Sequence, residues 1–292
     1  TTTWGGDKDV SRMHWINVFN TPEAVEPQHD FESSERAMQA TLRATRSLGL
    51  SSGADVLVFL NHPNFAWNAT AESIAAIEDL RHIEIYTALN MCNTFGDESH
   101  CSAERIWDVA LTLRLKEGGD LIYGLATDDC HTYAHHWELG DTALPGRAWV
   151  CVQADGLTPE HILGAVNCGN YYCSSGVTLN EVVRDNDRVA LEIQPREGVH
   201  YTTRFIGTPL DVDLSSEVVR NADGELVRTT RRYSEEMGQV LYETMDLHPS
   251  YTFTGNESYV RAVVTSDSVH PNPTGPGDYE KAWTQPVVPG KL

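Results

Sequence analysis

Basic side chains are scarce in this sequence. Lysine and arginine together number 21, against 42 aspartate and glutamate residues, which gives a formal net charge of -21. A polyanion such as nucleic acid, or an anionic membrane surface, would be repelled by this balance, so the sequence predicts neither as a partner. A small anionic substrate stays compatible with it, because a bound metal ion can reverse the local field.

Long hydrophobic runs are also missing. The longest aliphatic or aromatic run covers residues 56–60, whereas a helix needs about 20 apolar residues to cross a bilayer. The sequence therefore predicts no transmembrane segment.

Cysteine is limited to six residues, Cys92, Cys101, Cys130, Cys151, Cys168 and Cys173. An even number permits three disulfides, and two pairs, Cys92 with Cys101 and Cys168 with Cys173, would close short loops. Scattered core cysteines in a cytoplasmic protein are the alternative. The pattern favours a secreted or periplasmic protein and leaves a cytoplasmic location open.

The first two thirds of the chain alternate strand-like and helix-like segments. Expected strands cover residues 54–60, 83–86, 121–126 and 149–152, and expected helices cover residues 32–47, 69–80, 102–116 and 158–166. This alternation is typical of an α/β fold, in which crossover helices join parallel strands. Polar residues follow several of these strands, at the sheet edge where α/β proteins build their sites.

From about residue 181 the pattern changes. Short runs alternate apolar with polar residues, turns such as the one at residues 221–224 separate them, and no long helix is evident. This is typical of an antiparallel β-sandwich-like module. We therefore expect two domains, residues 1–180 and residues 181–292.

Four polar side chains stand where metal ligands are expected. Asp129 and His131 are two residues apart at the end of an expected strand, where alternate residues face the same way. His62 follows another strand, and His14 lies in a strand-like run. A carboxylate and imidazoles suit Zn, Mn or Fe. Each signal alone is weak, because such histidines are often hydrogen-bonded core residues.

The same residues recur within longer stretches. These stretches are HWINV at 14–18, FLNHPN at 59–64, IEIY at 83–86, GLATDDCH at 124–131, PGRAWV at 145–150, GNYYCSSG at 169–176 and AWTQP at 282–286. In this order they resemble the PHP (polymerase and histidinol phosphatase) family, most closely its CehA/McbA-like branch of metallohydrolases. The resemblance is strong from His14 to about residue 180 and looser beyond it, and only the combination of stretches is specific.

The resemblance implies a distorted (β/α)7 barrel, followed by the smaller β-sandwich-like domain, with a cluster of two or three divalent metal ions (Zn, Mn or Fe). Carried over to this sequence, the metal ligands would be His14, His62, Asp129 and His131. A metal-activated water would attack the substrate, a small anionic or ester molecule, with His131 in a catalytic role. Arg147 is expected to contact an anionic group, because a guanidinium matches phosphate or carboxylate oxygens. A structural Arg147 is the alternative.

The sequence also departs from the family pattern. The family begins with a His-x-His pair and has a metal-bridging Glu before the position of His14, and neither has a counterpart here. One account places the N-terminal part of the barrel, with these ligands, upstream of Thr1. A second predicts a cleaved chain whose N-terminal part stays associated, and a third a degenerate member that has lost the metal cluster. The expected partners therefore include a missing N-terminal segment or further copies of the chain in a homo-oligomer.

Two classes of function follow. One is a metal-dependent hydrolase of phosphoesters or, as the CehA type suggests, of carbamate or carboxyl esters. The other is a catalytically degenerate protein with a structural, binding or assembly role. Nuclease action, as in the polymerase-associated members, is disfavoured because a net charge of -21 opposes binding of long polyanions.

Overall fold

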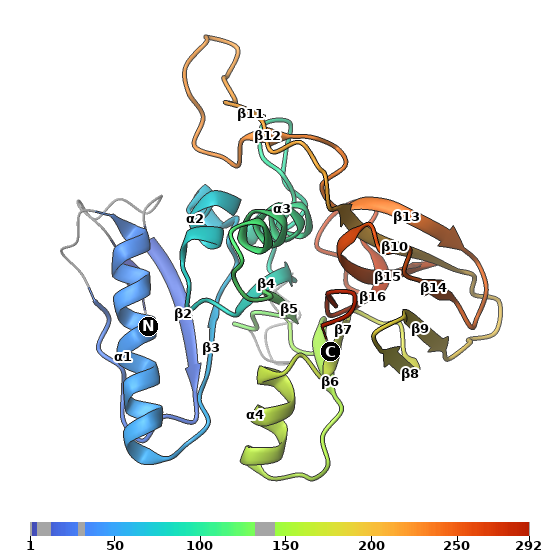
Figure 1. Ribbon diagram of the computed structural model, residues 1–292, viewed down its shortest axis with the longest axis horizontal. Helices are drawn as coiled ribbons and strands as arrows, with labels where there is room; N and C mark the ends of the chain where they lie inside the picture. Colours follow the sequence, from blue (N-terminus) through green and yellow to red (C-terminus); the bar gives the residue numbers. More distant parts are fainter. Residues whose placement is uncertain (1, 5–12, 29–32, 132–143, 292) are drawn as a thin grey trace.

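Sheet dominates this molecule. The computed structural model describes residues 2–4, 13–28, 33–131 and 144–291, and 33% of the structure is strand against 21% helix. Within these residues there are four α-helices, and most strand pairs are antiparallel (Figure 1). The expected (β/α)7 barrel is therefore wrong, because no closed barrel is found in the part of the chain that the structure describes.

The first sheet has five strands in the order β1-β2-β3-β4-β5. They are β1 (Thr2–Trp4), β2 (Met13–Phe19), β3 (Leu57–Leu60), β4 (His82–Thr87) and β5 (Tyr123–Thr127). β1, β2 and β3 run antiparallel, whereas β3, β4 and β5 are parallel neighbours. Because the sheet ends at β1 and β5 and only three strands are parallel, it does not form the closed parallel ring of a barrel.

Four α-helices accompany these strands, α1 (Ser34–Ser52), α2 (Ala71–Ala76), α3 (Ala103–Lys116) and α4 (Pro159–Asn167). Thr70 and Ser102 cap α2 and α3, because their side chains accept hydrogen bonds from backbone N–H groups in the first turns. α3 packs against β4, and α4 packs against β3 and β6. Two short 3-10 helices, η2 (Phe65–Trp67) and η3 (Asn90–Cys92), follow β3 and β4.

The second sheet has six antiparallel strands in the order β13-β10-β15-β16-β7-β6. They are β6 (Trp149–Val152), β7 (Tyr171–Ser174), β10 (Tyr201–Pro209), β13 (Gln239–Thr244), β15 (Glu257–Val269) and β16 (Tyr279–Thr284). The sequence pattern places β6 among parallel strands, but β6 pairs antiparallel with β7, and β7 pairs with β16. Ser174 lies opposite Ala282. Strands from both sides of residue 180 thus build one sheet.

A third layer covers the six-stranded sheet. This layer is a three-stranded antiparallel sheet of β8 (Leu179–Arg184), β9 (Arg188–Ile193) and β14 (Ser250–Thr252). A separate two-stranded pair, β11 (Ser216–Glu217) with β12 (Arg232–Tyr233), lies in a segment that projects from the rest (Figure 1). A core that includes Leu191, Phe205 and Val260 joins the three-stranded and six-stranded sheets. A second core, which includes Ile206 and Trp283, joins the six-stranded sheet to the first sheet and its helices.

Two features bear on the expectations for the chain as a whole. The described residues contain no helix long and apolar enough to span a membrane. All six cysteines lie within the described residues and carry free thiols. The two short-loop disulfides that the sequence permits, Cys92 with Cys101 and Cys168 with Cys173, are therefore not formed.

Candidate metal centre

Three loops meet at the carboxyl ends of the parallel strands β3, β4 and β5. They carry His62, Cys92 and Asp129, whose ligand atoms all lie within 4.8 Å of one another. Adjacent parallel strands bring their carboxyl ends to one edge of a sheet, and this edge is where ligands bind in open α/β sheets. An imidazole, a thiol and a carboxylate at this spacing could hold one metal ion.

His62 is enclosed by aromatic rings. Its ring contacts the rings of Trp15 and Phe65, with ring centroids 5.5 Å and 5.2 Å away. Its Nδ1 is buried and makes no hydrogen bond with the residues that the structure describes. Burial is the main cause that lowers the pKa of His62 below its usual value, and the Asp129 charge opposes this shift. A neutral imidazole with a free ring nitrogen is the form that binds metals.

Cys92 is 1% exposed, and its Sγ lies 3.7 Å from Asp129 Oδ2. Burial, followed by the charges of Asp129 and Glu84, raises the pKa of the Cys92 thiol well above its usual value. A cysteine nucleophile requires the opposite, an electropositive surrounding that stabilises the thiolate. The surroundings of Cys92 thus oppose nucleophilic catalysis, but they would favour a thiolate if a metal cation were bound.

Glu84 lies directly behind the triad and connects its strands. Its Oε2 accepts hydrogen bonds from His62 N at 2.7 Å and Thr87 Oγ1 at 3.0 Å, and its Oε1 accepts one from Thr127 Oγ1 at 3.0 Å. Burial raises the pKa of Glu84 to about 7, and the charge of Asp129 also raises it. Three acidic groups, Glu84, Cys92 and Asp129, therefore share one enclosed region.

The backbone around the triad is strained. Six non-glycine residues among those described have a positive φ, and five of them lie in the loops after β3, β4 and β5: His62, Ala66, Trp67, Asn93 and Asp129. Such conformations cost about 1–3 kcal/mol each and cluster at functional sites. Two of the three triad residues, His62 at φ 22° and Asp129 at φ 48°, are among them.

The structure brings together two of the four expected metal ligands, His62 and Asp129. His14 is fully buried on β2 and lies outside the triad. Its neighbour Trp15 contacts the His62 ring, so His14 points to the other face of the sheet because successive strand residues alternate. His131 is exposed, and its Nδ1 lies 2.7 Å from the Asp129 carbonyl oxygen.

Arg147, expected to contact an anion, is 2% exposed. Its guanidinium donates hydrogen bonds to the backbone carbonyl oxygens of Ala88 and Asn272. These contacts place it behind the loop that carries Cys92, rather than at the protein surface.

Two residues of the centre were missed by the sequence analysis. For Cys92 the sequence predicts a disulfide with Cys101 or a place in the core. Yet Cys92 follows the strand at 83–86, just as His62 and Asp129 each follow an expected strand. Glu84 is the single carboxylate in the otherwise uncharged run IEIY of that strand. This position could have indicated a functional role, because a buried charge needs a partner or a metal.

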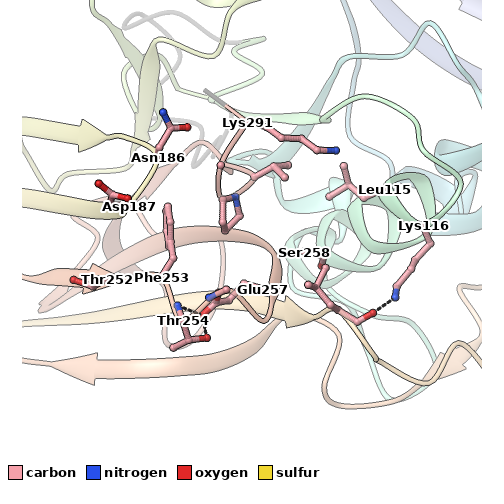
Figure 2. Close-up of a pocket in the computed structure, with 15 residues that line it drawn as sticks. Leu115, Lys116, Asn186, Asp187, Thr252, Phe253, Thr254, Glu257, Ser258 and Lys291 are labelled. Carbon is pink, nitrogen blue, oxygen red and sulfur yellow. Dashed lines mark hydrogen bonds between the residues drawn. The ribbon is translucent and has the colours of Figure 1, made fainter.

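A separate cavity of about 710 Å³ lies near the other end of α3. Figure 2 shows Lys116, the last residue of α3, and Asp187, Phe253 and Lys291 around it. The described residues that line this cavity include neither histidine nor cysteine. Its lining therefore offers no set of metal ligands comparable to the triad. The triad lies near the start of α3, because Asn64, two residues after His62, donates a hydrogen bond to the carbonyl oxygen of Cys101, just before the helix begins.

Comparison with known proteins adds no relative. The chain matches no protein-family model, no curated protein and no solved structure. The chemistry of the centre is therefore argued from its own residues.

Proposed function

We propose that this protein is a metal-dependent hydrolase of phosphoesters, with the metal ion held by His62, Cys92 and Asp129. The observation that carries the proposal is the convergence of these three ligand atoms within 4.8 Å at the ends of three parallel strands. Three protein ligands, with a further position left for water or substrate, are typical of catalytic zinc sites.

Cys92 favours zinc among the candidate metals. Thiolate is a soft ligand that selects zinc or iron over manganese and magnesium, while imidazole and carboxylate accept several metals. The two or three ions implied by the family resemblance would need ligands beyond this triad, and we propose one zinc ion here.

The residues of the centre fit a divalent cation electrostatically. Burial, with a contribution from the charge of Asp129, raises the pKa of both Glu84 and the Cys92 thiol when no cation is present. A cation at the triad would reverse this effect and stabilise all three anionic forms. When bound, it would also polarise an ester oxygen and lower the pKa of a water molecule.

His131 is placed to accept a proton beside the triad. Its Nδ1 lies 2.7 Å from the carbonyl oxygen of Asp129, and a carbonyl oxygen can only accept, so Nδ1 carries the hydrogen. In the neutral ring this leaves the lone pair on Nε2, and the side chain is 65% exposed. We assign to His131 Nε2 the role of general base toward water.

Carbamate and carboxyl esters need the same polarised carbonyl or phosphoryl oxygen, so the geometry of the triad does not separate them from phosphoesters. The acidic net charge of -21 favours a small substrate over a long polyanion. Assays with para-nitrophenyl phosphate, bis-para-nitrophenyl phosphate and para-nitrophenyl acetate distinguish phosphomonoesters, phosphodiesters and carboxyl esters.

Cobalt titration of metal-free protein tests the centre. We expect one equivalent of Co²⁺ to bind with a thiolate-to-cobalt absorption band, and Cys92→Ser to lose this band together with phosphoester hydrolysis. Cys173→Ser is the matched control, since Cys173 is also fully buried and raised in pKa but donates to Gly124 O instead.

Two results would count against the proposal. If wild-type protein binds no cobalt or zinc, the metal centre does not exist. If it binds metal through Cys92 but hydrolyses none of the esters, the triad is a structural metal site and the alternative of a non-catalytic protein stands.

A further inference from the structure

A buried guanidinium connects the two loops that supply Cys92 and Asp129. Arg147 Nη1 donates a hydrogen bond to the carbonyl oxygen of Ala88, the residue that follows β4 and opens the segment leading to Cys92. Ala88 N in turn donates to Thr127 O at 3.0 Å, at the end of β5. Arg147 thus holds the main chain where β4 and β5 give way to the ligand-bearing loops.

The residue before Arg147 holds the second loop directly. Gly146 N donates to Asp128 Oδ2 at 2.6 Å, and Asp128 Oδ1 accepts from Cys130 N at 3.2 Å. Asp128 and Cys130 flank Asp129, so these bonds fix the turn that presents the Asp129 carboxylate. Two consecutive residues, Gly146 and Arg147, therefore contact both loops.

The loop between β15 and β16 supports Arg147 from the other side. Arg147 Nε donates to Asn272 O at 2.9 Å, and His270 Nε2 lies 2.9 Å from Arg147 O. His270 Nδ1 accepts from Asn272 N at 3.0 Å, so its Nε2 is the donor to Arg147.

Asp278 anchors the same loop to β4. It is 1% exposed, and its Oδ2 accepts hydrogen bonds from Tyr86 OH at 2.9 Å and from Thr274 N at 2.9 Å. The loop is thus fastened at the carboxyl end of β4, beside the segment that leads to Cys92.

We propose that Arg147 is a positioning residue of the metal centre, which acts through main-chain carbonyls and not through contact with substrate. The inference rests on the proposed metal function, because it is the geometry of Cys92 and Asp129 that Arg147 preserves. A planar guanidinium can donate to two carbonyl oxygens in fixed directions, whereas a lysine ammonium cannot reproduce this fork. Residues that orient ligands typically change metal affinity by about 10- to 100-fold when replaced.

Arg147→Lys tests this role, with Arg114→Lys as the matched control. Arg114 is 4% exposed and, like Arg147, donates to backbone carbonyls, those of Ile74, Ile77 and Leu80 among them, but it lies on α3 away from the triad. Two quantities are measured on each variant, the affinity for Co²⁺ and, without metal, the hydrogen exchange of residues 88–92 and 128–130.

We expect Arg147→Lys to bind Co²⁺ about 10- to 100-fold more weakly, with an altered thiolate band and faster exchange in both segments. Arg114→Lys should lower the unfolding temperature but leave cobalt affinity within about twofold of wild type. A purely structural Arg147 would behave like Arg114.

Unchanged affinity and unchanged exchange in Arg147→Lys would overturn the inference. If wild-type protein itself binds no cobalt, the proposed function fails. The role of Arg147 in fixing the loops is then tested separately, and unaltered hydrogen exchange in metal-free Arg147→Lys would overturn it. If Arg147→Lys does not fold, Asp278→Asn loosens the same loop from Tyr86, and the same two measurements decide the question.

Discussion

His14 is enclosed so completely that neither ring nitrogen has a hydrogen-bond partner among the described residues. Burial lowers the pKa of His14 to about 4, and the nearby charge of Glu35 offsets this shift only in part. The folded protein therefore holds His14 neutral, while the unfolded chain protonates it near its ordinary pKa of 6.5. Acidification must then favour the unfolded state.

The pH dependence of stability tests this burial. Because the folded pKa is below the unfolded one, the stability from neutral His14 is complete above pH 6.5 and is lost as the pH falls toward 4. The unfolding free energy of the wild type should fall between pH 7 and pH 5, and His14→Leu should make this fall smaller by about 2 kcal/mol. Urea unfolding of metal-free protein at both pH values measures it.

An exposed histidine provides the control for this measurement. His248 is exposed, so changing it to Leu should leave in place the loss attributed to the buried ring of His14. If His14→Leu leaves the difference between the two pH values unaltered, His14 is not buried as described.

At this scale, sequence position predicted part of the metal centre. His62 and Asp129 were identified because each follows an apolar strand in a parallel arrangement, and the structure brings them together. Cys92 was hidden because its spacing to Cys101 suits a short disulfide loop. The orientation of His14 depends on which face of β2 packs on α1, and alternation along one strand does not reveal that.

Among the secondary-structure elements, α3 and β15 are joined by a buried ion pair. Arg261 of β15 is fully buried and donates to both carboxylate oxygens of Asp108 on α3, at 2.8 Å and 2.6 Å. Tyr259 OH donates to the same carboxylate at 2.7 Å. This contact fixes the six-stranded sheet against the helix that follows the Cys92 loop.

Removing one partner of this pair should be costly. Asp108→Ala removes both hydrogen bonds of Arg261 to Asp108 and leaves the buried guanidinium beside the Glu104 carboxylate, 3.1 Å away. We expect a loss of about 3 kcal/mol in unfolding free energy, at the low end for breaking a buried pair. The exposed pair Arg204–Glu243 is the control, and Glu243→Ala should cost less than about 1 kcal/mol. Chemical denaturation measures both, and similar losses in the two variants would contradict this account of α3.

Helix and strand positions were largely predictable, but strand partners were not. Helical spacing of apolar residues is a local signal, and the expected helices at 69–80 and 102–116 include α2 and α3. The expected strand at 149–152, β6, fits an alternating β/α pattern, yet β6 pairs antiparallel with β7. The other partner of β7 is β16, over a hundred residues later for Ser174 and Ala282. Pairing at such separation leaves no local mark in the sequence.

For the molecule as a whole, the three layers explain how the end of the chain reaches the metal centre. The six-stranded sheet shares one core with the first sheet and another with the three-stranded sheet. This places the loop between β15 and β16 behind β4, where Asp278 and Tyr86 meet. The expected barrel is wrong because parallel pairing stops at β5 and antiparallel strands follow it.

Anomalous diffraction from crystals grown with zinc tests the central claim most directly. We predict an anomalous peak within about 2.0–2.3 Å of a His62 ring nitrogen, Cys92 Sγ and an Asp129 carboxylate oxygen. A map without a peak at this triad, or with zinc bound elsewhere only, would contradict the metal centre and the hydrolytic function proposed from it.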